Sequence, residues 1–491
     1  MRPISRPRTV RATPTVAHYR WAAVGVVVFT VYGGLLPFHY TPRPLDEAVA
    51  AFRQTALWDP ADLGARGDWV VSVGQYAVLG FALMAAACCD RRWWAGLLAA
   101  PVVAAGAAAV AVGVEFLQLY FPPRTVSLND IVVESAGGAV GAVAWVAVGQ
   151  RVTGWARRLE AVTSLAGLGR RLLPAYVVAL VVAALMPFDF VVGRAELAAK
   201  AADGRVRLVP FADGLTAAAA GKAALTAAAF APLGLLTALA RRRSRQPGNR
   251  PVGLGPVLLA PAAIEALKLF VYSRTFDAAD IVAGTAGVLA GWRLGWGLRT
   301  APLAAWAFAP RLGLLGPVLG LAWLGAVLYA NWRPFDFTTD PAAFAADAQD
   351  LPAVGLRHFA LAPFVDYYWN SKYNALDRFL LKGLSFLPLG VLLAVAAREI
   401  YRPATLRRAV GLAAAAAVLV EAGRYFLPSH LPSVTDVLIQ TAGAWLGFRL
   451  TRFVRATLWA ESALYGWLRP AAVRSGAAAA QPQVLRFIGR P

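Results

Sequence analysis

Apolar runs of about 20 residues alternate with short polar segments along the whole chain. An α-helix rises about 1.5 Å per residue, so a run of this length covers the roughly 30 Å of hydrocarbon in a bilayer. The pattern predicts twelve membrane-spanning helices, near residues 20–37, 69–88, 94–120, 129–148, 172–188, 218–240, 252–272, 279–298, 312–330, 377–397, 408–427 and 434–453. We therefore predict an all-α, polytopic transmembrane helical protein.

Polar residues inside these runs recur at a fixed spacing. Glu115 is followed 15 residues later by Asp130, and Glu265 and Glu421 start the same pattern. Charged residues are costly within apolar helices, so a threefold recurrence marks positions that have a role. We predict three four-helix units, at residues 1–155, 170–300 and 311–455, and a tail at 456–491 that is first interfacial and then disordered.

Each unit carries further marks. The first predicted helix ends in a Pro-aromatic segment, which contains Asp189 in unit two and Asp336 in unit three. An amphipathic stretch follows, near 45–57, 194–202 and 341–351, and such stretches commonly lie flat at a membrane interface. The fourth predicted helix carries two Gly residues four apart, such as Gly287 and Gly291. They share one helix face and are predicted to permit close helix contact.

Charge distribution predicts the orientation. Of the 491 residues 58% are hydrophobic, and the net charge is +21. If the N-terminus is inside, most of the 48 Lys and Arg fall in the inner segments, and most acidic residues fall outside. This is the positive-inside rule. We therefore predict a multi-pass protein of the inner (cytoplasmic) membrane with both termini in the cytoplasm; the lipid bilayer is the expected partner, and nucleic-acid binding gains no support.

The candidate chemistry lies at the outer ends of the predicted helices. Glu115 lies about 9 Å inside the outer boundary, and Asp130 begins the returning helix. An outward-facing polar pocket is therefore predicted. Its candidate ligand-binding residues are Glu115, Gln118, Arg124, Asp130, Glu265, Arg274, Asp280, Glu421 and Asp436.

Structural alternatives stand beside this interpretation. Lys268 and Arg424 follow Glu265 and Glu421 by three residues, the spacing of an intrahelical ion pair. Unit one has Gln118 there, which cannot cancel a charge, so Glu115 is the carboxylate that needs another partner. The repeated Asp residues are interpreted as helix N-caps, with a catalytic acid as the alternative. For Arg124 and Arg274 three interpretations stay open. They form an ion pair with the repeated Glu, bind an anion such as phosphate, or are solvated in the loop.

No motif for a metal, a cofactor or a catalytic nucleophile is visible. The four His are scattered, and the chain has no Walker loop, no dinucleotide-binding loop and no Ser/His/Asp set. We expect no metal site and no cofactor, and a non-enzymatic role is favoured over an enzymatic one.

The ordered motifs resemble those of the VanZ-like family. Residues 230–234 and 386–390 match its Phe-x-Pro-Leu-Gly, 115–118 its Glu-x-x-Gln, and 274–280 its Arg-Thr-Phe-Asp-x-x-Asp. The three copies cover about residues 20–455. The resemblance implies a polytopic helical membrane protein, and some members are associated with low-level resistance to glycopeptide antibiotics of the teicoplanin type. The family's Asn four residues after the Asp is Glu134, Gly284 and Gln440 in this chain.

The resulting hypothesis is an accessory cell-envelope factor. It would bind or shield an outer-leaflet envelope component, such as a lipid-linked glycan precursor. One alternative is a proton- or ion-coupled transporter that uses the three Glu. The other is an intramembrane enzyme acting on an envelope lipid, with Glu115 and Asp130 as acid and base.

The charge bias generates a prediction about topology. Reporter fusions after Arg92 and after Arg243 should report the cytoplasm, and a fusion near Asp350 should report the outside, because basic segments are retained on the inner side. An outside signal at Arg243 would contradict the arrangement.

Overall fold

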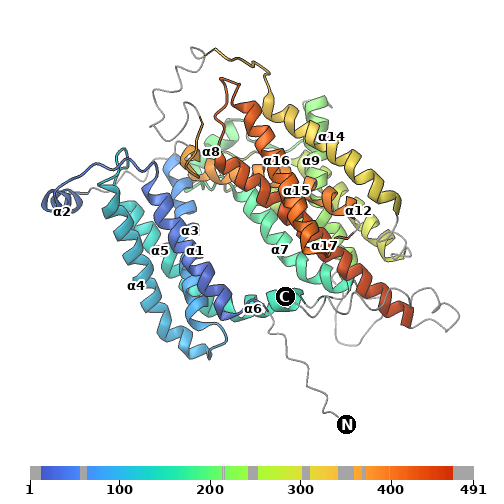
Figure 1. The fold of residues 1–491 in the computed structure, drawn as a ribbon, viewed down its shortest axis with the longest axis horizontal. Coiled ribbons are helices and arrows are strands. Elements are labelled where there is room, and N and C mark those ends of the chain that lie inside the picture. The colour runs from blue at the N-terminus through green and yellow to red at the C-terminus, as the bar shows by residue number, and fades with distance from the viewer. Residues whose placement is uncertain are drawn as a thin grey trace, which may run out of the picture.

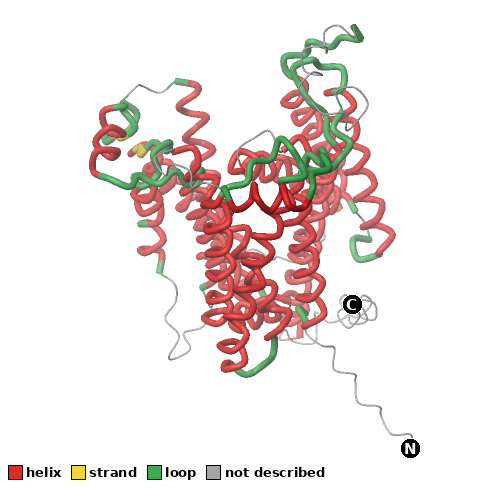
Figure 2. The backbone as a smooth tube through the Cα atoms, turned by 90° about the vertical axis from the view of Figure 1, so that its left-hand side faces the viewer, coloured by secondary structure: helices red, strands yellow, loops and turns green. Residues whose placement is uncertain are grey.

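The computed structural model describes residues 13–55, 63–160, 162, 164–212, 214, 216–241, 253–300, 310–340, 359–367, 372–397 and 399–467. This part of the chain is almost entirely helical (Figures 1 and 2), which confirms the all-α class. Its two named strands, β1 (Val206–Arg207) and β2 (Phe276–Asp277), pair in parallel over two residues. This pairing joins the segment after α8 (Arg194–Ala202) to the segment before α12 (Ala278–Thr300) in the second unit.

Each predicted unit contains four long helical segments in the same order. The first unit holds α1 (Val16–Leu35), α2 (Leu45–Arg53), α3 (Leu63–Cys88), α4 (Trp93–Gln118), α5 (Leu128–Ala144), a π-helical turn (Trp145–Gly149) and α6 (Gln150–Glu160). The second holds α7 (Leu165–Leu185), α8 (Arg194–Ala202), α9 (Ala217–Ala240), α10 (Leu254–Leu258), α11 (Ala260–Lys268) and α12 (Ala278–Thr300). The third holds α14 (Pro310–Trp332), a 3₁₀ turn (Val365–Tyr367), α15 (Lys372–Ala396), α16 (Pro403–Arg424) and α17 (Val434–Trp467).

The second and fourth long helices of every unit pack most closely: α3 on α5, α9 on α12 and α15 on α17. Glycine permits this approach. A Cβ at Gly287 would overlap the carbonyl oxygen of Ala227, and one at Gly443 would overlap that of Gly383. The prediction that the paired Gly residues are packing positions is therefore confirmed.

Eight helices within the described residues are long and apolar enough to cross a membrane. A multi-pass membrane protein is thus supported, but the count of twelve is not confirmed. The predicted span at 252–272 is wrong as a single helix, because α10 ends at Leu258 and α11 begins at Ala260. Pro256 and Pro261 lie on either side of this break, and proline removes a helix hydrogen bond and clashes with the preceding turn.

The predicted amphipathic stretches of the first two units form the short helices α2 and α8; the third, at 341–351, lies outside the described residues. The first part of the predicted tail, through Trp467, continues helix α17, and the rest of the tail lies outside the described residues. Helices α1 and α17 begin and end, respectively, on one side of the molecule, with α2 and α8 on the other (Figure 1). This second side is called the outer side below, after the predicted orientation.

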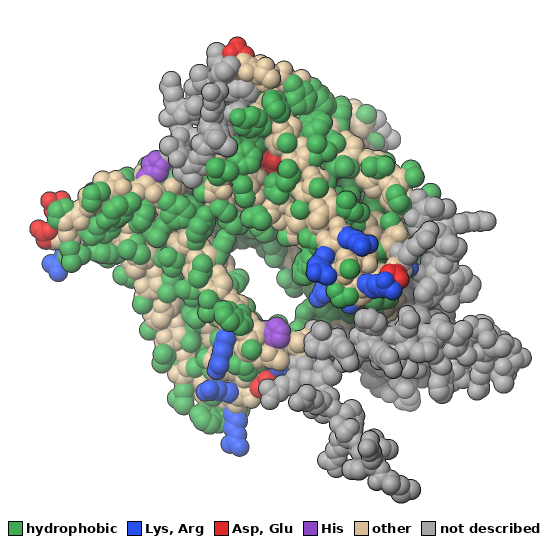
Figure 3. Space-filling view, viewed as in Figure 1, with side chains coloured by type: hydrophobic (Ala, Val, Ile, Leu, Met, Phe, Trp, Pro, Cys, Tyr) green, Lys and Arg blue, Asp and Glu red, His purple; other side chains and the backbone are tan. Residues whose placement is uncertain are grey.

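The units join near their two ends. On the outer side, Arg66 of α3 pairs with Glu196 of α8 at 3.1 Å, and the Tyr32 hydroxyl of α1 donates to the Pro363 carbonyl at 2.8 Å. At the opposite end an apolar cluster joins the second and third units: Val162, Leu165, Leu168 and Leu239 with Phe453 and Val454. Between these zones Figure 3 shows an opening through the molecule, bordered largely by hydrophobic side chains.

The glycine contacts generate a prediction about stability. Gly287→Ala should lower the unfolding free energy of the purified protein by about 1–3 kcal/mol, because overpacking forces the helices apart. Gly221→Ala on α9 is the control, since no atom lies within 4 Å of its added Cβ. Equal unfolding temperatures for both variants in detergent would contradict the close-packing interpretation.

Candidate functional site

The repeated Glu holds the start of the fourth long helix in every unit. The main-chain N–H of Ser127 donates to Glu115 Oε2 at 3.1 Å. The N–H of Asp277 donates to Glu265 Oε2 at 3.2 Å, and that of Ser433 to Glu421 Oε2 at 3.1 Å. All three Glu side chains are buried. A carboxylate at a helix N-terminus also complements the helix dipole, so this contact stabilises the link between the third and fourth helices.

The interpretation of Asp130, Asp280 and Asp436 as N-caps is wrong. Each lies inside the first turn of its helix. The side chain three positions earlier accepts a main-chain N–H of that turn and so caps the helix. The Ser127 hydroxyl accepts the N–H of Asp130 at 3.4 Å, and the Asp277 carboxylate accepts that of Ala279 at 2.9 Å. Because the earlier residue takes the cap, the repeated Asp is left to face the helix bundle.

The linking Arg residues bind main-chain carbonyls at the end of the first helix. Arg124 donates to the carbonyls of Leu36 (2.7 Å) and Gly33 (2.8 Å) at the end of α1. Arg274 donates in the same way to Met186 and, at 3.3 Å, to Ala183. The last carbonyls of a helix lack partners within it, so these Arg residues act as caps supplied from a neighbouring segment.

Asp189 and Asp336 fasten the Pro-aromatic segment to the same linker. Asp189 accepts hydrogen bonds from the N–H and the hydroxyl of Ser273, both at 3.0 Å. Asp336 accepts one from the Ser429 hydroxyl at 3.5 Å. These carboxylates therefore position the outer loops.

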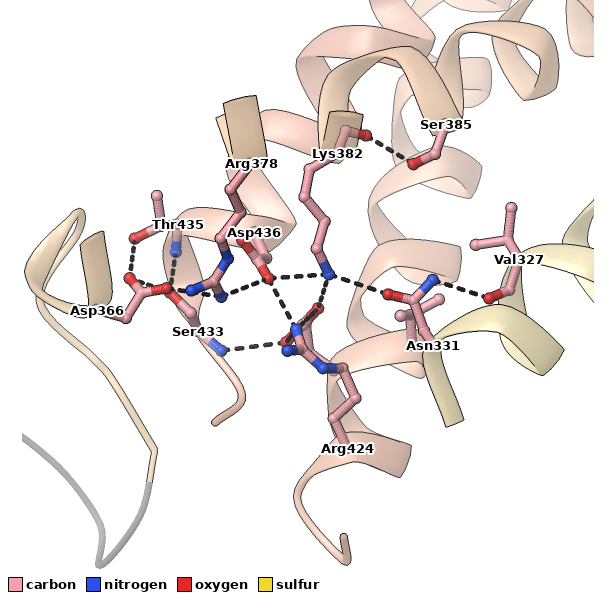
Figure 4. Close-up of polar contacts among 12 residues, drawn as sticks. Val327, Asn331, Asp366, Arg378, Lys382, Ser385, Arg424, Ser433, Thr435 and Asp436 are labelled. Carbon is pink, nitrogen blue, oxygen red and sulfur yellow. Dashed lines mark hydrogen bonds and ion pairs between the residues drawn. The ribbon is translucent and has the colours of Figure 1, made fainter. Parts of the chain in front are cut away.

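The third unit contains a charge-balanced network (Figure 4). The predicted pair between Glu421 and Arg424 is present at 2.9 Å, and Arg424 also lies 2.7 Å from Asp436. Lys382 of α15 lies 3.1 Å from Asp436. Arg378, on the same helix, joins Asp436 (3.2 Å) to Asp366 (3.0 Å). Three carboxylates thus meet three cations, which is the condition for holding charges in a buried site.

Hydroxyl groups complete this network. The Tyr367 hydroxyl donates to Asp436 at 3.1 Å, and the hydroxyls of Ser433 and Thr435 donate to Asp366 at 2.8 and 3.1 Å. Burial raises the pKa of Asp366, although Arg378 and these hydroxyls oppose the shift.

The second unit has three carboxylates but two lysines. The predicted pair between Glu265 and Lys268 is present, and Lys268 also lies 3.2 Å from Asp280. Lys222 of α9 pairs with Asp277 at 2.6 Å and with Asp280 at 3.2 Å. Burial would raise the pKa of Asp277, but the hydrogen bonds from Lys222 and from the Ala279 amide outweigh it, and the pKa falls.

The first unit gathers three carboxylates, and none of the three positions that hold Arg378, Lys382 and Arg424 in the third unit carries a cation. Asp130 and Glu134 are close enough to Glu115 for their charges to repel it. The nearest ammonium comes from the third unit: Lys372, the first residue of α15, lies 4.0 Å from Glu134 and donates to the Ser72 hydroxyl at 2.6 Å. Arg124 attracts Glu134 electrostatically while donating to the carbonyls of α1.

One carboxylate oxygen in this cluster has no partner. Glu134 is only 7% exposed and its carboxylate interacts with the Tyr76 hydroxyl, while its Oε2 makes no hydrogen bond within the described residues. A buried polar atom without a hydrogen bond is costly, so the site has capacity for one more donor.

Sequence reasoning missed the residues of the second long helix. The second long helix of each unit contains a Leu-Gly pair, whose glycine is Gly80, Gly234 or Gly390. Twelve residues before this glycine stand Asp68, Lys222 and Arg378. One turn later stand Thr226, Lys382 and Ser72. Aligning the units on that glycine would have found these positions. Lys372 could not have been found in this way, because it acts across units.

None of the described residues form a cluster of three or more His, Cys, Asp or Glu side chains suited to a metal ion. The carboxylates of the sites face lysine, arginine and main-chain N–H groups instead.

The charge balance generates a prediction about stability. Glu421→Gln leaves three cations, of which Arg424 is buried, with two carboxylates, so it should lower stability by roughly 3 kcal/mol. Glu115→Gln keeps an oxygen for the Ser127 amide and breaks no ion pair with a side chain of its own helix, so the protein level and the unfolding temperature should stay almost unchanged. Similar losses in both variants would refute the difference between the units.

Comparison with known proteins agrees with this threefold organisation. A family model described as VanZ/LLP1 matches the chain at residues 12–149, 173–299 and 310–455. Comparisons with the curated proteins and with the solved structures give no match. The three matches cover most of the chain and follow the order of the three units. The chain therefore belongs to the VanZ/LLP1 family, with three tandem units of that family in one polypeptide.

Proposed function

We propose that this protein is an accessory factor of the cell envelope. In this proposal its first unit binds, from the outer side of the membrane, a positively charged group of an outer-leaflet component, and the second and third units form the frame. Lipid-linked glycan precursors that carry an amine are one such class of component. The observation that carries the proposal is the difference in charge balance between three equivalent sites.

The first and third sites differ in the number of cations that face their carboxylates. The third site is neutral because Arg378, Lys382 and Arg424 match its carboxylates. At the corresponding positions the first unit has Asp68, Ser72 and Gln118. The first site thus lacks the cations of its own second and third long helices that balance the third site, and Lys372 and Arg124 only partly balance its three carboxylates. A carboxylate cluster with remaining negative charge attracts a cationic ligand more than a neutral one.

The Glu134 oxygen without a hydrogen bond also points to the first unit as the binding unit. Glu134 replaces the Gly284 of unit two and the Gln440 of unit three, so only the first unit has a fourth-helix carboxylate at this position. An ammonium group carries several N–H donors, and it would satisfy Glu134 Oε2 while adding a charge-assisted bond.

Access from the outer side is consistent with the linker. Thr125 is exposed two residues before the Ser127 cap, and Asp130 is half-buried, whereas Asp436 in unit three is fully buried. The first site is thus the more open of the two.

The alternatives gain less support. A relay between the three Glu requires shared contacts, but each Glu is held by the cap residue of its own unit. An enzyme that uses Asp130 as a base requires a nearby nucleophile or substrate, and the repeated Asp has an ion-pairing role in units two and three.

The proposal predicts a charge preference that can be measured without knowing the ligand. Thr125→Cys should react from outside intact cells with membrane-impermeant methanethiosulfonates. A cationic reagent should be favoured over an anionic one by about tenfold, after correction for their rates with a free thiol in solution. The reason is that one or two uncompensated charges contribute about 1 kcal/mol each for charges about 4 Å apart in water, and about 1.4 kcal/mol is a tenfold change. The native Cys88 and Cys89 are buried and add no background.

Two controls separate charge from accessibility. Adding Glu134→Gln should reduce the preference, whereas adding Glu265→Gln should not, because it leaves the second site with two lysines and two carboxylates. Thr275→Cys at the matching position of unit two should show a smaller preference. Absence of labelling from outside would overturn the outward site, and equal corrected rates would overturn cation binding.

A further inference from the structure

A second candidate binding site lies at the other end of the second unit. An open surface pocket of about 370 Å³, called the cavity below, is lined by Arg241, Trp292, Arg293 and Trp296. Arg241 directly follows the last residue of α9, and Trp292 is twelve residues along α12 from Asp280, about 18 Å at 1.5 Å per residue. The cavity is therefore remote from the acidic site.

Its lining is chemically specific. The Arg241 guanidinium lies 5.2 Å above the centre of the Trp292 ring, and the Trp292 and Trp296 rings are stacked at 6.4 Å with 18° between their planes. A guanidinium over an aromatic face is attracted to the ring, and its N–H donors can still bind oxyanions. Among the described residues the lining has two cations and no carboxylate, so it favours an anion.

The cavity is a feature of the second unit. Arg241 stands seven residues after Gly234, and the positions seven after Gly80 and Gly390 are Ala87 and Ala397. The positions that correspond to Trp292 hold Ala142 and Phe448. Packing common to the family units therefore does not require the Arg and Trp pair.

We propose that this cavity binds the phosphate headgroup of an anionic phospholipid in the leaflet next to the basic loops. Tryptophan favours the level of the headgroups, and arginine binds phosphate oxygens in bidentate geometry. Basic pockets between membrane helices on this side are suited to such headgroups. Trp296, half-exposed, offers its ring to the glycerol and upper acyl chain while the two Arg face the phosphate.

The test measures lipid retained by the full chain. Protein purified from membranes is placed in phosphatidylcholine nanodiscs. These also contain phosphatidylglycerol and labelled phosphatidylcholine in equal small amounts. After detergent extraction, native mass spectrometry counts the lipids that stay bound to the protein. Wild type should retain phosphatidylglycerol selectively. Each of Arg241→Gln and Arg293→Gln should reduce this about fivefold, the effect of one basic residue at an anionic surface.

Arg449→Gln is the matched control. Arg449 has the position of Arg293 in unit three and lies 5.6 Å over Trp445, so the change removes the same charge from a similar Arg–Trp contact. Retention should then stay within twofold of wild type. Equal retention of both lipids by wild type, or equal losses in all three variants, would overturn the site. If inorganic phosphate displaces the bound lipid and the protein shows no preference between the two lipids, the phospholipid proposal is wrong and the cavity is assigned to a soluble phosphate compound.

Discussion

The hydrogen bond from a main-chain N–H to a buried carboxylate is the contact on which each unit depends. It joins the end of the third long helix to the start of the fourth, and it is present with nearly the same length in all three units. A carboxylate in an apolar bundle is expensive to bury, but a helix N-terminus offers both a donor and a favourable dipole. The same Glu can therefore be retained for structure in every unit while its remaining partners change.

Those partners distinguish the units. In the third, arginine and lysine from the second and third long helices neutralise the Glu, the Asp and Asp366. In the second, two lysines face three carboxylates. In the first, Glu134 adds a carboxylate and the closest ion-pairing ammonium belongs to Lys372 of another unit. One backbone frame thus supports a closed ionic core at one position and an open acidic site at another, because charge balance resides in side chains that the frame does not fix.

The units depend on one another as well as on their own cores. Glycine-mediated packing of the second and fourth long helices is internal to each unit, whereas Arg66, Tyr32 and Lys372 make their contacts across units on the outer side. At the other end, apolar side chains of α17 meet those of the second unit. The connections therefore lie near the ends of the helices, and an opening separates the first unit from the others between them (Figure 3).

The sequence by itself determined the helical class, the threefold repeat, the packing glycines and the ion pairs of Glu265 and Glu421, because each depends on spacing along one helix. It also placed Glu115 in the unit that has Gln118 where the other two units have Lys268 and Arg424. Only the tertiary structure decided the partners of Arg124 and Glu134, since these lie on another helix or in another unit. The N-caps were predicted three residues too late, because Ser and Asp are both common N-cap residues and both occur near the start of these helices. The break between α10 and α11 was hidden because hydropathy averages over the prolines that cause it.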